Sequence, residues 1–371
     1  MNKQIPPINY LFMLAYAYDY DWDYLTQGLE ESKIDELSLL EVEILMLVQW
    51  SSRIIRTNFY KSFNTKTAQT QRLRGRVLFP EDIKSGNMNS AQLTCKYGEV
   101  SFDVLVNQIL LATLDKCRKL LHRSESKGSS KEKLETKLMK TLRRIKPEVS
   151  FIQLRREHFR KVTFSRENEH YRPVINLCKL IFDRKALDKS GEISGFGLPD
   201  NKKAQIFETF LHNYLHDEFE RAPITVKPEK KKGWVERESD RDYIPGIQPD
   251  IVVREEDTPV MVLDAKFYKK AVKSGQYEGK DNLKTHSKNL YQILSYINYY
   301  NCDGMLVYAQ TERGHFEQMA KINDEHYEDQ GPDREFGFYT LDLSGGLDQL
   351  RKSMEQLKGK VRKCFMAESK V

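Results

Sequence analysis

The chain has 371 residues, of which 39% are hydrophobic and 31% are charged, and its 60 Lys and Arg against 54 Asp and Glu give a net charge of +6. This composition supports a packed core of about two domains and excludes a histone-like polycation. No apolar run approaches the ~18 residues of a membrane span, no GxxxxGK[ST] loop of a P-loop NTPase occurs, and the scattered cysteines favour a reduced cytoplasmic protein over a disulfide framework or a zinc ribbon.

The N-terminal part is predicted to be mostly helical, with one polar projection. Residues 8–25 form the first expected helix, because the segment lacks the small-residue cleavage pattern of a signal peptide. Residues 36–57 form the second, with a broad apolar face. Residues 58–76 are polar, contain no acid and end in closely spaced arginines, which predicts an exposed projection or an ordered loop. Residues 93–104 are predicted to form β structure with a turn at Gly98, followed by a helix from Phe102 to Leu121.

A strongly basic stretch follows at residues 118–146. It is either a solvated helical face or a surface that follows a DNA backbone. Further helices are predicted at 170–186 and from residue 202 onward, where apolar side chains recur on one face. The rest of the chain alternates strands with a helix, which is typical of an α/β domain.

The segment 247–269 contains the residue pattern with the clearest chemical meaning. Two β-rich runs, 249–254 and 259–267, flank a turn-like EEDTP, so the segment predicts a hairpin. Side chains alternate along a strand, which places Asp264 and Lys266 on one face. If the turn centres near residue 257, Asp250 lies opposite Asp264.

Two carboxylates in such a position repel each other unless a cation lies between them. Like charges on opposed strands are destabilising, whereas Mg²⁺ prefers carboxylate oxygens and water as ligands. Such a cation would lower the pKa of a bound water and shield a phosphate, and a lysine nearby could orient the water or stabilise developing charge. The alternative is a surface hairpin with scattered charges, but the surrounding valines and isoleucines favour burial, where unpaired carboxylates are costly.

Two helices could complete this site. Gln292 and Tyr296 are spaced i, i+4 on one face of a predicted helix, where they could hydrogen-bond a phosphate or hold Lys266. Glu208 lies at the edge of an apolar stripe, so it is either an ordinary surface acid or a further metal ligand. His286, just before the Gln292 helix, could cap that helix or contact a phosphate.

The order of these motifs resembles that of the PD-(D/E)xK nuclease superfamily: PDI at 249–251, DAK at 264–266 and QxxxY at 292–296. The wider chain resembles the McrC family, the nuclease subunits of McrBC-type restriction systems. The matching segments are spread over most of the chain: IPPINYLFMLAYAYDYDW at the N-terminus, RLRGRVLF at 72–79, FDVLVNQILLATL at 102–114, YIPGIQPDIVV at 243–253, VLDAKFYK at 262–269 and HSKNLYQILSYI at 286–297.

The resemblance implies an α/β (α+β overall) fold with two domains. Residues 161–371 would form a PD-(D/E)xK restriction-endonuclease-like domain with a central mixed sheet flanked by helices. Residues 1–160 would form a mostly helical domain with a small β projection. The implied catalytic residues are Asp250, Asp264, Lys266, Gln292 and Tyr296, and the implied ligands of Mg²⁺, with Mn²⁺ as a possible substitute, are Asp250, Asp264, Ala265 and Glu208.

The resemblance also implies partners. McrC-like proteins join a hexameric ring of McrB-type AAA+ subunits, which hydrolyse GTP (ATP in some relatives) and translocate double-stranded DNA, and modified cytosine is recognised by the partner. The N-terminal projection of the family stimulates that hydrolysis. In this chain it corresponds to the acid-free segment 53–76, with Arg53, Arg56, Arg72, Arg74 and Arg76 as candidate contacts.

Two other functions remain open at this stage. The chain could be mainly an activator of the motor without cleavage. It could also be a standalone QxxxY-type repair nuclease acting on DNA ends, although many such relatives hold an iron–sulfur cluster on four cysteines whose spacing is absent here.

Overall fold

A computed structural model describes residues 5–27, 29–85, 92–124, 128–184, 200–219, 224–227, 246–267, 273–277, 280–284, 287–310, 317–321 and 334–366. The chain divides into two compact units. The sheet unit comprises Met1–Val42 and Ser190–Val371, and the helical unit comprises Glu43–Lys189. Among the described residues, no helix is both long and apolar enough to span a bilayer.

The sheet unit is built on a six-stranded sheet in the order β10-β11-β9-β6-β5-β4. β6 pairs in parallel with β9, and β9 with β11, whereas the other neighbours are antiparallel. The sheet is therefore mixed, as expected, and the α/β class is confirmed. Its strands are β4 (Ile224–Lys227), β5 (Ile251–Glu255), β6 (Thr258–Phe267), β9 (Asp303–Gln310), β10 (Glu317–Lys321) and β11 (Glu335–Asp342). A separate two-stranded sheet pairs β7 (Lys273–Tyr277) with β8 (Lys280–Lys284).

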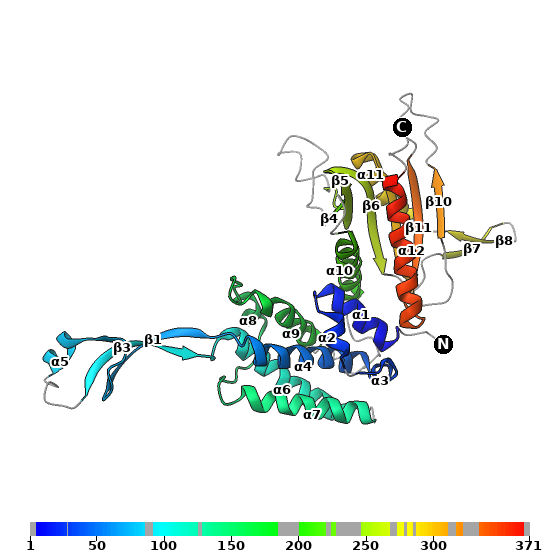
Figure 1. Cartoon of the computed structure of the whole chain (residues 1–371). Helices are drawn as coiled ribbons and strands as arrows, with labels where there is room; N and C mark the ends of the chain where they lie inside the picture. The colour runs from blue at the N-terminus through cyan, green and yellow to red at the C-terminus, as the bar shows by residue number, and fades with distance from the viewer. Residues whose placement is uncertain are drawn as a thin grey trace. The chain divides into compact units, whose positions relative to one another are not determined.

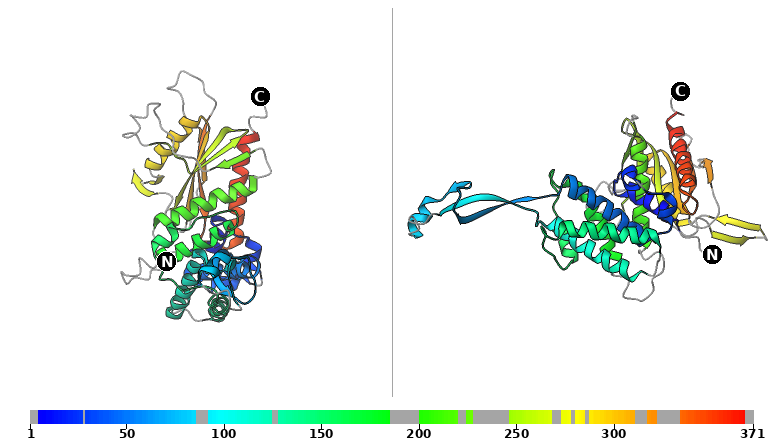
Figure 2. Two further views of the ribbon diagram at one scale, coloured as in Figure 1. Left: turned by 90° about the vertical axis from the view of Figure 1, so that its left-hand side faces the viewer. Right: turned by 60° about the horizontal axis from the view of Figure 1, so that its bottom comes forward.

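Helices cover both faces of this sheet (Figure 2, left). α11 (Ser287–Tyr300) packs on one face, where the core includes Val252, Val262, Ile293 and Ile297, all fully buried. α10 (Asp200–Phe219) packs against β4 and β6, and α12 (Leu347–Met366) packs against β6 and β11, on the opposite face of the sheet. α1 (Pro7–Ala17), α2 (Trp22–Thr26) and α3 (Glu31–Asp35) complete the unit.

Gly304 allows α11 to lie close to β9. A Cβ at this position would be 2.5 Å from Ile297 Cγ1 and 3.1 Å from Ile293 Cγ1, and both isoleucines are fully buried. Gly304→Ala is expected to destabilise the fold by about 1–3 kcal/mol in urea denaturation, because the core must shift to accept the methyl group. Gly359→Ala on α12 is the control: nothing lies within 4 Å of its Cβ position, so it should be neutral or slightly stabilising. Equal stability of the two variants would contradict this close packing.

The N-terminal segment differs from the single helix predicted for residues 8–25. α1 ends at Ala17, Asp19 has a positive φ of 55°, and α2 starts at Trp22 with Asp21 accepting a hydrogen bond from Tyr24 N. The chain turns here because Asp19 tolerates the left-handed region and Asp21 caps the next helix.

The boundaries of the two compact units differ from the domain boundary expected near residue 160, because the first 42 residues belong to the sheet unit. α1 packs on α10 in the sheet unit, where the rings of Phe12 and Tyr16 contact Phe210 and Tyr16 contacts Tyr214. Asn9 donates to the carbonyls of Leu343 and Gly345. These aromatic contacts and buried hydrogen bonds join the two ends of the chain in one core, a pairing that local patterns do not predict.

The helical unit is a bundle with a projecting sheet. The buried Glu43 on α4 pairs with Arg184 on α9, with 2.6 Å between Oε1 and Nη2. Ser52 on α4 contacts Thr141 on α7 through their hydroxyls, 3.1 Å apart. Its helices are α4 (Leu39–Thr57), α6 (Leu105–Arg123), α7 (Ser129–Ile145), α8 (Arg156–Arg160), the 3₁₀ turn η2 (Glu169–Tyr171) and α9 (Arg172–Arg184). Cys95, Cys117 and Cys178 in this unit and Cys302 in the sheet unit are free and buried.

The polar segment predicted as a projection forms a long antiparallel ribbon. β1 (Ser62–Thr70) pairs with β3 (Leu93–Ser101), and the short β2 (Arg76–Val77) lies on the other edge of β3. The ribbon extends from the helices of its own unit and carries α5 (Phe79–Ser85) near its end (Figure 1). The turn predicted at Gly98 is wrong: Gly98 lies opposite Thr65 within the ladder, because β1 supplies the missing strand partner.

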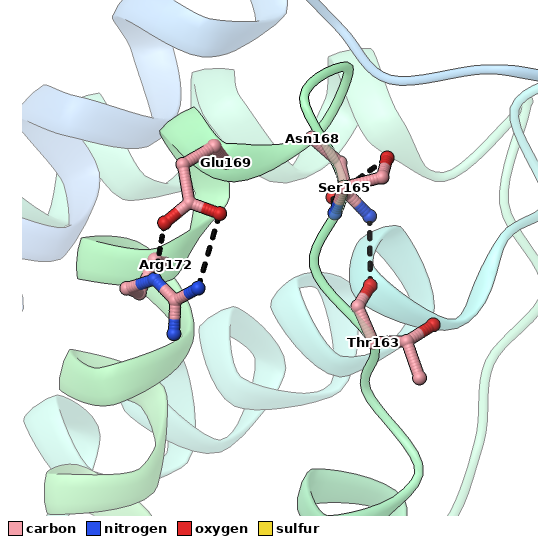
Figure 3. A network of polar contacts seen from close by, with 5 residues as sticks. All are labelled: Thr163, Ser165, Asn168, Glu169 and Arg172. Carbon is pink, nitrogen blue, oxygen red and sulfur yellow. Dashed lines mark hydrogen bonds and ion pairs between the residues drawn. The ribbon is translucent and has the colours of Figure 1, made fainter.

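The base of the ribbon is anchored by the turn that leads into α9. Figure 3 shows Asn168 donating to the carbonyl of Thr163 and accepting from Ser165 N, and Glu169 paired with Arg172. Tyr171, directly before Arg172, is fully buried and accepts a hydrogen bond from Tyr60 N at 3.1 Å. The ribbon therefore starts from a fixed point in the helical unit.

Candidate active site

The β5–β6 hairpin brings Asp250 and Asp264 together, as the alternation predicts. Glu256 and Asp257, at its turn, have positive φ values of 46° and 72°, typical of a type I′ turn that suits the twist of the strands. Ile251 pairs with Leu263, so the next position before β5, Asp250, is opposite Asp264. A two-residue turn alone would pair Asp250 with Leu263, so the irregularity between Val253 and Arg254 shifts the register by one residue and places Asp250 opposite Asp264.

Asp250 is fixed by the neighbouring strand. Its Oδ2 accepts a hydrogen bond from Ala265 N at 2.7 Å. The Asp250 side chain thus extends the hydrogen bonding between the two strands by one residue beyond the start of β5. Ala265 thus fixes Asp250 through its backbone N–H, whereas Ala265 as a ligand of the metal stays a prediction. This contact could not be derived from the alternation of side chains alone.

Lys266 lies between the carboxylates and α11. Its ammonium forms an ion pair with Asp264 and donates to Gln292 Oε1 at 3.1 Å. Gln292 Nε2 donates in turn to the Tyr296 hydroxyl at 2.8 Å, and this hydroxyl donates to the Gln248 carbonyl at 3.0 Å. The i, i+4 pair on α11 therefore holds the lysine. Gln248, which the sequence patterns did not single out, takes part through its backbone carbonyl.

Burial makes these carboxyl groups hard to ionise without a cation. Asp264 is 1% exposed, and its Oδ1 has no hydrogen-bond partner in the described part of the chain. Burial, followed by the charges of Asp264 and Glu208, raises the pKa of Asp250 well above its usual range. Burial also raises the pKa of Asp264, against the effect of Lys266. Two adjacent acids in this state, one with an unsatisfied oxygen, fit a divalent cation.

Glu208 on α10 lies within electrostatic range of this pair. Its pKa is raised by burial and then by the charge of Asp264. Across the described residues, however, no three His, Cys, Asp or Glu side chains converge as ligands of one ion. The structure therefore brings together Asp250, Asp264, Lys266, Gln292 and Tyr296, whereas Glu208 as a metal ligand stays a prediction. His286 lies outside the described residues.

The hydroxyl of Tyr296 is expected to stabilise this arrangement. Tyr296→Phe leaves the Gln248 carbonyl without a donor and Gln292 Nε2 without an acceptor, which should cost about 1–3 kcal/mol of unfolding free energy in urea titrations. Tyr291→Phe is the control, because the Tyr291 side chain is 69% exposed on the same helix. A Tyr296→Phe protein as stable as this control would contradict the hydrogen-bond chain.

The five predicted partner-binding arginines occupy two settings in the helical unit. Arg53 and Arg56 lie on α4, where the Arg53 guanidinium is 4.8 Å from the centroid of the Trp50 ring. Arg72, Arg74 and Arg76 are exposed in the ribbon, in and next to the loop between β1 and β2. Large apolar side chains are also exposed there: Leu73 (68%), Phe79 (55%) and Ile83 (62%).

Comparisons with known proteins point to one family. Residues 9–309 match the family model described as "McrBC 5-methylcytosine restriction system component". The type IV methyl-directed restriction enzyme EcoKMcrBC of Escherichia coli (strain K12) is 24% identical over 331 residues, which is 86% of this chain and 90% of that protein.

Two solved structures are also similar. A half-complex from the tetradecameric assembly of Thermococcus gammatolerans McrB AAA+ hexamers with bound McrC matches with a TM-score of 0.56 and 19% identity, over 95% of this chain and 76% of that chain. This likeness supports the fold. A cryo-EM structure of the McrBC complex of the same organism matches 48% of this chain and 52% of that chain, with 25% identity and a TM-score of 0.37.

Proposed function

Because the chain belongs to the McrBC family of 5-methylcytosine restriction system components, we propose that it is the Mg²⁺-dependent DNA endonuclease subunit of such a system, with a PD-(D/E)xK site. The observation that carries the proposal is the contact set on the β5–β6 hairpin. It places Asp250 beside Asp264, and joins Lys266 to Asp264 and to Gln292. This arrangement suits hydrolysis of a phosphodiester bond.

Each residue has a role that follows from its contacts. Asp250 and Asp264 would hold the cation, with Ala265 fixing Asp250 through its N–H. When bound, the cation would supply an activated water and shield the phosphate charge. Lys266, held by Gln292, is positioned to orient the attacking water or to stabilise negative charge on the phosphate. Tyr296 positions Gln292 and anchors it to the backbone of Gln248.

We further infer that the ribbon engages an AAA+ partner. The similar solved assembly contains McrB AAA+ hexamers with bound McrC, and the ribbon of this chain carries exposed arginines beside exposed apolar side chains. Arginine with neighbouring apolar residues is the composition of energetically important interface positions. The partner would be a hexameric McrB-like GTPase whose hydrolysis this chain stimulates, and double-stranded DNA would be the substrate of both.

Reconstitution with the partner tests the cleavage function. Methylated duplex DNA, the partner ring, GTP and this chain should give double-strand cleavage with Mg²⁺ and none when EDTA removes the metal. Mn²⁺ should restore activity. Cleavage that persists in excess EDTA would rule out the metal-dependent mechanism.

The same assay separates the two other functions. Cleavage of DNA ends by the isolated chain, without partner or nucleotide, would instead identify a standalone nuclease. Stimulated hydrolysis by the partner without any DNA cleavage would identify a non-cleaving activator, the function that the exposed ribbon alone would support.

A further inference from the structure

One side of α7 carries basic side chains and no acid. The residues lie at i, i+4, i+7 and i+11, a spacing that keeps them on one face of a helix. All are exposed, and they flank the buried side of the helix, which Leu134, Leu138 and Leu142 form. α7 lies at the edge of its helical bundle (Figure 1). We call this set the α7 basic stripe: Lys133, Lys137, Lys140 and Arg144.

The positive charges of the stripe are not neutralised within the described structure. None of its four side chains forms an ion pair there, and by the same helical spacing Glu132 and Glu135 lie on the other flank of α7. Partial desolvation of its ammonium, and then the charge of Lys133, lower the pKa of Lys137. Like charges four residues apart destabilise a helix slightly. An anion bound along the stripe would relieve that repulsion.

We propose that the α7 basic stripe binds the phosphate backbone of duplex DNA, as a contact separate from the catalytic hairpin. From Lys133 to Arg144 the stripe spans ~16 Å at ~1.5 Å per residue. A duplex of that length carries about ten phosphates on its two strands. Four cations on one face can therefore each reach a phosphate of an undistorted duplex. This inference rests on the proposed function only in taking DNA as the substrate.

A nucleic-acid backbone fits the stripe better than a protein surface does. Lysine is depleted at the cores of protein–protein interfaces, which rely on aromatic and apolar anchors. The stripe has none: Met139, 38% exposed, lies on the flank that carries the glutamates. Flexible, sequence-independent cations of this kind are what phosphate contacts use.

The salt dependence of DNA binding by the full chain tests the proposal. Fluorescence anisotropy with a labelled 30-base-pair duplex, in EDTA to prevent cleavage, would compare wild type with the stripe variant Lys133→Gln, Lys137→Gln, Lys140→Gln and Arg144→Gln. Each lost phosphate contact lowers the slope of log K against log salt by about 0.9. We expect the slope to fall by about 2–4 and the affinity at 0.1 M salt to fall on the order of 10–100-fold.

A charge-matched control separates this site from net charge. It neutralises four exposed cations elsewhere in the helical unit, as Lys146→Gln, Lys161→Gln, Arg166→Gln and Lys179→Gln. Its slope should stay within about one unit of the wild type, and thermal melting should show both variants folded. Equal losses in the two variants, or no salt-dependent DNA binding by wild type, would overturn the proposal.

Two further outcomes are informative. An unchanged slope with loss of the partner's stimulated nucleotide hydrolysis would assign the stripe to the motor protein and also overturn the proposal. The binding assay needs neither metal nor cleavage. A failure of the nuclease assignment would therefore appear only in the cleavage assay, and the salt dependence of DNA binding could still be interpreted.

Discussion

Replacing Asp264 by asparagine is expected to lower DNA cleavage at least about 10²–10³-fold while leaving the fold intact. Asp264 is 1% exposed, and burial raises the pKa of its carboxyl group. Asparagine keeps the size of the side chain and removes the charge that a cation requires. The variant loses the ion pair with Lys266, which keeps its hydrogen bond to Gln292, but it also removes a costly buried carboxylate. The two effects oppose each other, so the protein should remain folded.

The matched control for this variant lies on the same hairpin. Asp257 is exposed at the turn with a φ of 72°, a conformation that asparagine tolerates well. Asp257→Asn therefore removes one negative charge without touching the site. Cleavage with the partner ring, Mg²⁺ binding by calorimetry and assembly by gel filtration should be measured for both. Asp264→Asn should lose cleavage and metal binding but keep assembly, and wild-type cleavage by this variant would remove the basis of the nuclease proposal.

The hairpin could be predicted from the sequence because its rules are local. Alternation places Asp264 and Lys266 on one face. The turn at Glu256 and Asp257 and the one-residue register shift between Val253 and Arg254 then place Asp250 opposite Asp264. The spacing of Gln292 and Tyr296 is likewise a property of one helix. Their contact with Lys266 was expected because a glutamine at that place can accept from an ammonium.

The features that escaped prediction depend on distant segments. A glycine at position 98 suggests a turn, but β3 continues through it because β3 pairs with β1, an earlier segment of the chain. The contacts of Phe12 and Tyr16 with α10 likewise have no trace in the local sequence. The hydrogen bond from Ala265 to Asp250 is a backbone contact, which residue types do not reveal. Periodicity thus predicts which side chains share a face, and packing decides which faces meet.

Neutralising two ribbon arginines is expected to reduce the partner's stimulated nucleotide hydrolysis at least tenfold. Arg72 and Arg74 are exposed in the loop between β1 and β2 around the exposed Leu73, and the Arg74 guanidinium lies 5.9 Å from the centroid of the Tyr97 ring. In contrast, Arg53 is half-buried on α4 and Arg76 belongs to β2. Arginines central to an interface often contribute about 2 kcal/mol or more each. Arg72→Gln with Arg74→Gln should therefore lose most stimulation, and cleavage that depends on the motor should fall in parallel.

The shaft of the same ribbon supplies the control. Lys61→Gln with Lys66→Gln removes the same charge from its other end, where Lys61 lies over the Phe63 ring and Lys66 pairs with Glu99 on β3. Stimulation should be measured by phosphate release at saturating GTP, and the affinity for the ring by titration. If the loop acts by contact rather than by net charge, only the arginine variant loses stimulation. Equal effects of the two variants would instead mean that the ribbon attracts the ring through its overall charge, and Arg72 and Arg74 would then have no specific role.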